Sequence, residues 1–188
     1  MTTLYPSRRG LSRRAALLGV GGSLVSLAGC ASEVDATQRL GVASAPSGST
    51  GPLRSFRFVT LDRRVASTDS YRGRMSLVVL AATYDAASQV QARFVNAVYL
   101  KHRPRINALL LVLEPTQHEV LVDAFRQSLG LRYDVAIADP ETIAGRGPFP
   151  GLHHVPSVVM LDREGHEVWR NLGVVEEHQL HEALDAND

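Results

Sequence analysis

The sequence predicts a domain of the α/β class, and three observations lead to that prediction. Residues 77–81 and 106–113 are almost continuously apolar, which is typical of strands buried on both faces of a sheet. Apolar residues at helical spacing follow each run. A third strand over 133–138, a hairpin turning at 162–165 and a last helix over 174–184 complete an alternating order of strands and helices.

The central stretch is 75–98, where the strand turns into a helix. Apolar or small residues recur at positions 87, 90, 94, 95 and 98, the spacing of one helical face. Asp85 stands where the helix should begin. A carboxylate there accepts hydrogen bonds from free backbone N–H groups and is favoured by the helix dipole. We therefore expect Asp85 to cap this helix, with a ligand or acid–base role as the alternative.

The next helix is expected to start with a capping box formed by Thr116 and Glu119. Gly130 fits its C-terminal stop. Asp139 and Pro140 have the pattern of a cap and a first-turn proline for a further short helix. The expected buried stripe of the first of these helices consists of Val120, Leu121, Ala124, Phe125 and Leu129.

The strand, turn and helix over 75–98 resemble the active-site segment of thioredoxin-fold proteins, particularly the membrane-tethered TlpA/ResA type. In that family the strand runs into Trp-Ala-Thr-Trp-Cys-x-x-Cys at a helix N-terminus. Ala82 and Thr83 match this pattern, and Tyr84 stands where the second Trp would be. Asp85 and Ser88 occupy the two cysteine positions. The resemblance thus implies the shape of the redox site without its dithiol.

Two further landmarks support the resemblance. The segment 155–165 is similar to the family element Val-Pro-Thr-x-x-x-x-Asp-x-x-Gly, with Ser157 in place of Thr. In the family this proline, here Pro156, is cis and its loop faces the active-site helix. The residues before the central strand resemble the family's N-terminal hairpin and lead-in. The resemblance implies a thioredoxin-like three-layer sandwich, with a central mixed sheet flanked by helices and an N-terminal hairpin extension.

Residues 1–29 have the pattern of a signal peptide, with basic residues before a mild apolar stretch that is too short and glycine-rich to span a membrane. Arg13 and Arg14 lie in a segment that resembles a twin-arginine export motif, although its common Phe is missing, so the general secretory route stays open. Leu-Ala-Gly-Cys at 27–30 resembles a bacterial lipobox. Processing would cleave before Cys30 and attach diacylglycerol to its sulfur; an ordinary signal peptide with an incidental Cys is the alternative.

This pattern divides the chain into a signal peptide over 1–29, a lipidated flexible tether over 30–52 and a thioredoxin-like domain over 53–188. The tether is rich in Ala, Ser, Thr and Gly and has no apolar periodicity. We expect an exported protein, anchored to a membrane through the lipid on Cys30 and facing the periplasm or the cell exterior.

Cysteine usage and charge exclude several functions. Cys30 is the single cysteine of the chain. If it carries lipid, the mature domain has no thiolate, which disulfide exchange and peroxide reduction both require. Residues 30–188 carry 16 basic and 19 acidic side chains, so electrostatics give no support to nucleic-acid binding. We find no phosphate-binding loop and no Ser-His-Asp order, and we expect no cofactor and no catalytic residue.

Histidines are the candidate metal ligands. His153 and His154 would lie near Asp85 if their loop is placed as in the family. Neighbouring side chains of an extended segment point in opposite directions, so we expect no shared metal ion. His178 and His181 are expected on a solvated face of the last helix, without a metal.

The leading hypothesis is a redox-silent thioredoxin-like lipoprotein that binds a protein or peptide partner. The alternatives are a thiol–disulfide oxidoreductase or peroxiredoxin-like enzyme of the TlpA type, and a metal carrier that uses the loop histidines. For Tyr84, exposure beside a partner and packing in the core are both open. The expected binding groove consists of Tyr84, Ala86, Ala87, His154, Val155 and Pro156.

Overall fold

The computed structural model describes residues 43–44 and 51–187. Contacts divide the chain into the units 1–36 and 37–188, and every described residue belongs to the second unit. The expected signal peptide, Cys30 and most of the expected tether lie outside the described residues. Within the described ranges, no helix is long and apolar enough to cross a bilayer.

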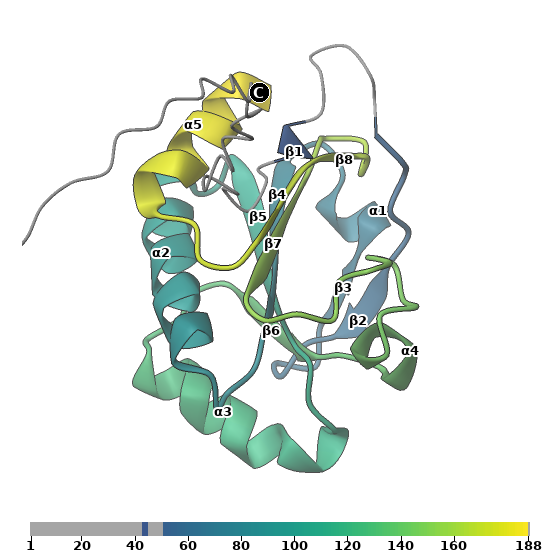
Figure 1. Cartoon of the computed structure of the whole chain (residues 1–188), viewed down its shortest axis with the longest axis vertical. Coiled ribbons are helices and arrows are strands. Elements are labelled where there is room, and N and C mark those ends of the chain that lie inside the picture. The colour runs from purple at the N-terminus through teal and green to yellow at the C-terminus, as the bar shows by residue number, and fades with distance from the viewer. Residues whose placement is uncertain (1–42, 45–50, 188) are drawn as a thin grey trace, which may run out of the picture. The chain divides into compact units, whose positions relative to one another are not determined.

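The structure alternates strands and helices in the predicted order (Figure 1). The strands are β1 (Ala43–Ser44), β2 (Arg57–Val59), β3 (Val65–Ser67), β4 (Met75–Ala81), β5 (Ile106–Val112), β6 (Asp134–Ile137), β7 (Ser157–Leu161) and β8 (Glu167–Leu172). The helices are α1 (Thr68–Tyr71), α2 (Ala86–His102), the 3-10 turn η1 (Thr116–His118), α3 (Glu119–Ser128), α4 (Pro140–Ile143) and α5 (Glu177–Asn187).

A mixed sheet forms the centre of the domain, in the strand order β1-β8-β7-β4-β5-β6. The strands β4, β5 and β6 are parallel, whereas β7 pairs antiparallel with β4 and β8 pairs antiparallel with β7. The predicted N-terminal hairpin is present as the separate pair β2–β3. Ala43 and Ser44, which fall in the segment expected to be a tether, pair with β8 as β1.

Two apolar cores cover the faces of this sheet, because the side chains of each strand alternate between them. Leu77 and Val79 of β4 belong to the core under α2 and α5, whereas Val78 and Leu80 belong to the other. Figure 1 shows α2 and α5 on one side of the sheet, and the hairpin, α1 and α4 on the opposite side. The predicted layered α/β fold is therefore confirmed.

The helix α2 buries a face shifted from the predicted one. The residues that it buries are Ser88, Gln91, Ala92, Val95 and Val98. Positions 95 and 98 were predicted correctly, but Val90 is exposed. Polar Ser88 and Gln91 are buried because both hydrogen-bond to backbone groups outside α2, to Ala82 N–H and Val175 N–H. A pattern that counts apolar residues does not detect such positions.

The start of α3 was predicted incorrectly, and its buried stripe only in part. Thr116 begins a 3-10 turn, the α-helix starts at Glu119, and no side chain caps it. Val120 is 80% exposed, and Leu121 is exposed as well. The helix buries Phe125, as predicted, and Val122, which the prediction did not include. It lies beside the edge strand β6, so only a narrow stripe of it meets the core.

The predicted helix end at Gly130 and the predicted cap at Asp139 are confirmed, whereas α5 begins and ends three residues later than the predicted 174–184. Gly130 has φ +61°, and its N–H donates to Gln127 O while Leu131 N–H donates to Arg126 O. This is the paired bonding of a glycine-terminated helix. Asp139 caps α4 by accepting a hydrogen bond of 2.8 Å from Thr142 N–H.

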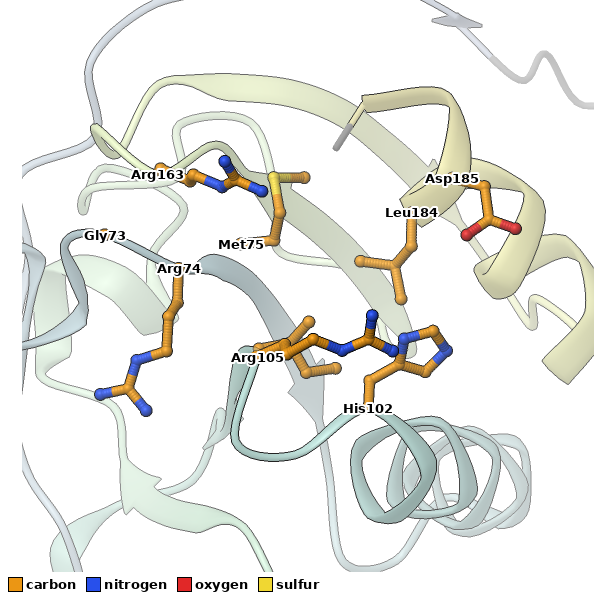
Figure 2. Close-up of a pocket in the computed structure, with 9 residues that line it drawn as sticks. Gly73, Arg74, Met75, His102, Arg105, Arg163, Leu184 and Asp185 are labelled. Atoms are coloured by element: carbon orange, nitrogen blue, oxygen red, sulfur yellow. The ribbon is translucent and has the colours of Figure 1, made fainter.

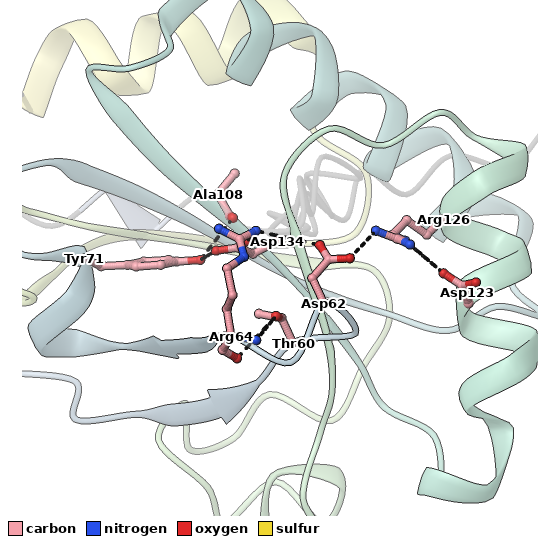
Figure 3. A network of polar contacts seen from close by, with 8 residues as sticks. All are labelled: Thr60, Asp62, Arg64, Tyr71, Ala108, Asp123, Arg126 and Asp134. Carbon is pink, nitrogen blue, oxygen red and sulfur yellow. Dashed lines mark hydrogen bonds and ion pairs between the residues drawn. The ribbon is translucent and has the colours of Figure 1, made fainter.

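The N-terminal hairpin is fastened to β6 (Figure 3). Leu61 N–H donates to Val135 O at 2.8 Å, and Thr60 forms a bridge with Ala136. Asp134 of β6 accepts hydrogen bonds from the Arg64 guanidinium at 2.6 Å and from the Tyr71 hydroxyl at 2.8 Å. These contacts place the hairpin along the outer side of β6.

Candidate functional site

The segments of the expected site meet at one end of the sheet. Leu80 of β4 pairs with Ser157 of β7. The residues that follow Leu80 therefore lie at the same end as those that precede Ser157. The Val155–Pro156 peptide bond is cis, as the resemblance implied, and Pro156 O accepts a hydrogen bond of 2.8 Å from Gly173 N–H. The turn before α2, the cis-proline loop and the chain after β8 thus border one surface.

Asp85 caps α2, as predicted. Its backbone is extended, with φ −99° and ψ 120°, as is usual for a capping residue. Its Oδ2 accepts hydrogen bonds from Ser88 N–H at 2.7 Å and from the Ser88 hydroxyl at 2.6 Å. Ser88 Oγ in turn accepts a hydrogen bond of 3.2 Å from Ala82 N–H. The two side chains that stand at the cysteine positions therefore bind each other and the local backbone.

This pair offers no nucleophile for thiol chemistry. Ser88 is fully buried, with an exposed fraction of 0%. A carboxylate such as that of Asp85 cannot form a mixed disulfide. The helix N-terminus that can stabilise a thiolate stabilises the Asp85 carboxylate here. The polar groups of Asp85 and Ser88 therefore act in capping α2.

Glu114 is a site residue that the sequence analysis did not single out. It follows β5 at the same end of the sheet and is only 3% exposed. Its Oε1 accepts a hydrogen bond of 2.5 Å from Thr83 N–H, and its Oε2 lies 2.8 Å from His118 Nδ1. Burial alone would raise the pKa of Glu114, but the hydrogen bonds from Thr83 and His118 outweigh burial and lower it. Glu114 thus holds the turn in place as a carboxylate.

Exposed apolar side chains border the site. Tyr84 is 80% exposed, which settles its position outside the core. Leu172 and Val174 are 46% and 44% exposed, on either side of the glycine that bonds to Pro156. We call this region the former-site surface; its residues are Tyr84, Ala86, Ala87, His154, Val155, Leu172 and Val174, and the predicted groove residue Pro156 lies buried beside them.

Comparison with known proteins identifies the fold. No family model and no curated protein matches the sequence. Among solved structures, a DsbF homologue from Corynebacterium diphtheriae is 16% identical, with a TM-score of 0.63 over 76% of this chain and 96% of that one. A thiol:disulfide interchange protein of the thioredoxin family from Chlorobium tepidum is 20% identical, with a TM-score of 0.62 over 74% and 97%. StoA from Bacillus subtilis is 14% identical, with a TM-score of 0.57 over 71% and 98%.

The chain has a thioredoxin-like fold. At these identities the likeness concerns the fold alone, and fold does not determine function. The thioredoxin-like domain of this chain lacks cysteine throughout its described residues. Within this fold, Asp85 and Ser88 occupy the positions that the resemblance assigns to the two cysteines.

The histidines of this thioredoxin-like domain are placed differently from the prediction. The rings of His153 and His154 lie 4.3 Å apart, centroid to centroid, so the expectation that they point in opposite directions is wrong. Within residues 43–44 and 51–187, no three His, Cys, Asp or Glu side chains are placed to hold a metal ion. His178 is exposed as predicted, whereas His181 is half-buried. Its Nδ1 lies 2.9 Å from Nε2 of His102.

Proposed function

We propose that this chain is a redox-silent thioredoxin-like lipoprotein. It is exported, held at a membrane by the lipid on Cys30, and binds a protein or peptide through the former-site surface. The observation on which the proposal rests is the pair of residues at the dithiol positions. Asp85 and Ser88 satisfy each other's hydrogen bonds and cap α2, while the apolar side chains around them face outward.

The exposed side chains favour binding over catalysis. An aromatic ring at 80% exposure leaves a large apolar area in water, and such rings are common anchors of interfaces. Leu172 and Val174, on either side of the glycine that bonds to Pro156, are further exposed apolar side chains. The backbone around them is held by Glu114 and by the bond from Gly173 to Pro156. A partner would meet a preorganised surface, which lowers the entropic cost of binding.

The alternative is a thiol–disulfide enzyme, and the solved neighbours include proteins described as thiol:disulfide interchange proteins. That function needs a thiolate, and Cys30 is the only source of one in the chain. The metal-carrier alternative has the close pair His153 and His154 in its favour but lacks a third ligand among the described side chains. Binding of a partner through the former-site surface requires neither a thiolate nor a metal ligand.

A crosslinked pulldown of the membrane-anchored protein tests the binding proposal. Tyr84→Ala should lose most of the captured partner. Val174→Ala should weaken capture, whereas Val120→Ala on α3, the same change at a residue 80% exposed outside the former-site surface, should leave it unchanged. Equal capture by the wild type, Tyr84→Ala and Val174→Ala would contradict the assignment of this surface.

An insulin-reduction assay with dithiothreitol tests the absence of redox activity. Residues 31–188 should not reduce insulin above the buffer control, because they contain no thiol. In the double variant Asp85→Cys, Ser88→Cys, the thiol at position 85 should have a pKa below the value of about 8.5 for a free cysteine, because it lies at a helix N-terminus. Activity of the unsubstituted domain would refute the proposal.

The lipid anchor has its own test. Cys30→Ala should yield a soluble or uncleaved product, since lipoprotein processing requires the cysteine sulfur. Mass spectrometry of the wild-type protein should find diacylglycerol on Cys30. A mature soluble protein with a free Cys30 thiol would overturn the anchor and would also supply the thiol that the enzyme alternative needs.

A further inference from the structure

A cavity lies at the opposite end of the sheet from the former-site surface. It has a volume of about 250 Å³ and is lined by residues at the start of β4, the start of β5 and the ends of α2 and α5 (Figure 2). Seven residues of β4, at about 3.3 Å each, separate the two ends by roughly 20 Å. A small ligand bound in this cavity therefore cannot touch Tyr84 or Asp85.

Three arginines from three segments line this cavity: Arg74 before β4, Arg105 before β5 and Arg163 in the turn between β7 and β8. Backbone hydrogen bonds hold these segments together. Gly73 N–H donates to Arg163 O at 2.8 Å, and Arg105 N–H donates to His102 O at 2.8 Å. The Arg74 guanidinium donates to a third backbone group, Pro104 O, at 3.3 Å. The cationic side chains thus project from a scaffold that the fold itself determines.

The charge around the cavity is positive in a chain whose residues 30–188 carry more acids than bases. Among the described residues that line the cavity, Asp185 is the one acid. The pKa of His102, also in the lining, is lowered, first by burial and then by the charges of His181, Arg105 and Lys101, which outweigh Asp185. The excess of arginines and the lowered pKa of His102 both indicate a positive electrostatic potential in the cavity, which disfavours a further cation and favours an anion.

The apolar part of the lining completes the site. Met75 and Leu184 contribute buried side chains to it. Figure 2 shows the Arg163 guanidinium near Met75 and the Arg105 guanidinium near His102, below Leu184, whereas Arg74 points away from them. Arg105 and Arg163 therefore flank an apolar wall, which suits a ligand with an anionic head and a short apolar portion.

We propose that this cavity binds a phosphoryl group, with Arg105 and Arg163 as its ligands and Met75 and Leu184 in contact with the attached carbon atoms. The planar guanidinium forks match phosphate oxygens and bind them in pairs. The volume is below the roughly 300–1,000 Å³ of sites for drug-sized ligands, so the cavity takes one head group rather than a nucleotide cofactor. A soluble phosphate ester and an anionic phospholipid head group share this chemistry.

Titration of the full-length protein with inorganic phosphate, followed by NMR of the His102 ring and the Arg105 Nε–H signal, tests the site. Binding should saturate, and the pKa of His102 should rise because the bound anion stabilises its imidazolium. Arg105→Ala should weaken binding about tenfold or more, the effect of removing a charge-assisted hydrogen bond. The affinity of Arg105→Lys for phosphate should lie between those of the wild type and Arg105→Ala, because lysine keeps the charge but lacks the planar guanidinium.

Arg93→Ala on the exposed side of α2 is the matched control and should bind phosphate like the wild type. Arg163→Ala provides a second variant on a different segment. Arg105 is exposed, so the Arg105→Ala variant should unfold at the wild-type temperature. Absence of saturable binding, or the same loss in Arg93→Ala as in Arg105→Ala, would overturn the site.

Vesicles separate the two sources of the phosphoryl group. If the ligand is a phospholipid, phosphatidylglycerol vesicles should bind the wild type more strongly than Arg105→Ala, and phosphatidylcholine vesicles should not distinguish them. If the ligand is a soluble ester, inorganic phosphate should bind the site, and the wild type and Arg105→Ala should bind each kind of vesicle equally. These experiments need no partner at the former-site surface, so their outcome is independent of the function proposed above.

Discussion

Two carboxylates support the same turn, Asp85 and Glu114, and they do so in different ways. Asp85 is partly exposed and bonds to Ser88, three residues along the chain. Glu114 is buried and bonds to Thr83, 31 residues away. The first contact is a property of the local sequence. The second exists only because β4 and β5 pair in parallel and end side by side.

Asp85 and Glu114 are also expected to differ in how much each contributes to the stability of the domain. A capping residue contributes about 1 kcal/mol to stability. A buried carboxylate with hydrogen bonds on both oxygens contributes more, because each charge-assisted bond is worth roughly 1.5–3 kcal/mol. The residue that the sequence does not reveal is therefore expected to matter more for the shape of the site.

The largest expected effect follows from Glu114→Ala. It should lower the free energy of unfolding by about 3 kcal/mol, since Thr83 N–H loses its acceptor. Glu114→Gln keeps an acceptor and should cost less. Urea denaturation measures both, with Glu164→Ala, an exposed glutamate, as the control. A Glu114→Ala protein as stable as Glu164→Ala would show that Glu114 does not hold the turn.

The stability of the domain should depend on pH through the carboxylate of Glu114. The pKa of Glu114 is lowered on folding, and so is that of Glu167, where burial is outweighed by the bonds and charges of Arg170 and Arg54. The folded state therefore binds fewer protons than the unfolded state. Stability should be full above the unfolded value of about 4.3 and fall as the pH drops through the folded pKa values.

Urea denaturation from pH 6 to pH 3 checks this prediction with Glu114→Gln beside the wild type. The variant should lose less stability across the acid range, because one of the two groups no longer titrates. A variant with the same acid sensitivity as the wild type would assign the effect to Glu167 and other carboxylates.

Asp85→Ala should have an intermediate effect, a loss of about 1 kcal/mol, and Asp85→Ser should cost less because Ser also caps well. Asp139→Ala, which removes the cap of α4, is the matched control for a pure capping effect. Thermal unfolding and partner retention should be measured together. A more stable Asp85→Ala protein that no longer retains its partner would reject the capping role and restore a chemical one.

The smallest expected effect on stability is that of Tyr84→Ala, within about 0.5 kcal/mol of the wild type, because its ring is 80% exposed. Calorimetry measures this change, and Val120→Ala at the same exposure is the reference. A large loss would mean that the ring packs against the domain in solution. The pulldown with this variant would then report folding rather than binding.

Features determined by neighbouring residues were predictable from the sequence. The apolar runs of β4 and β5, the caps at Asp85 and Asp139, and the helix end at Gly130 all depend on side chains within a few positions. The cis-proline was predicted by the family resemblance and is present. Ser67 and Ser70 form a capping box for α1, a local signal that the prediction passed over.

Features that depend on distant contacts were missed. Gln91 is buried because Val175 N–H, in the segment between β8 and α5, donates to its side chain. Leu121 is exposed because α3 packs at the edge of the sheet, where few strands lie beneath it. Glu114 carried one sequence signal, a charged residue directly after a buried strand that ends at the site. Only the register of β4 and β5 identifies its partner.

The hairpin along β6 has a consequence for how copies of this chain meet. A strand with one neighbour offers its free N–H and C=O groups to any other extended chain, and such edges promote aggregation. Here Thr60 and Leu61 occupy that side of β6, and Arg64 and Tyr71 hold them there through Asp134. The sheet is thereby closed to intermolecular strand addition at β6, so two copies of this domain cannot join their sheets through that strand.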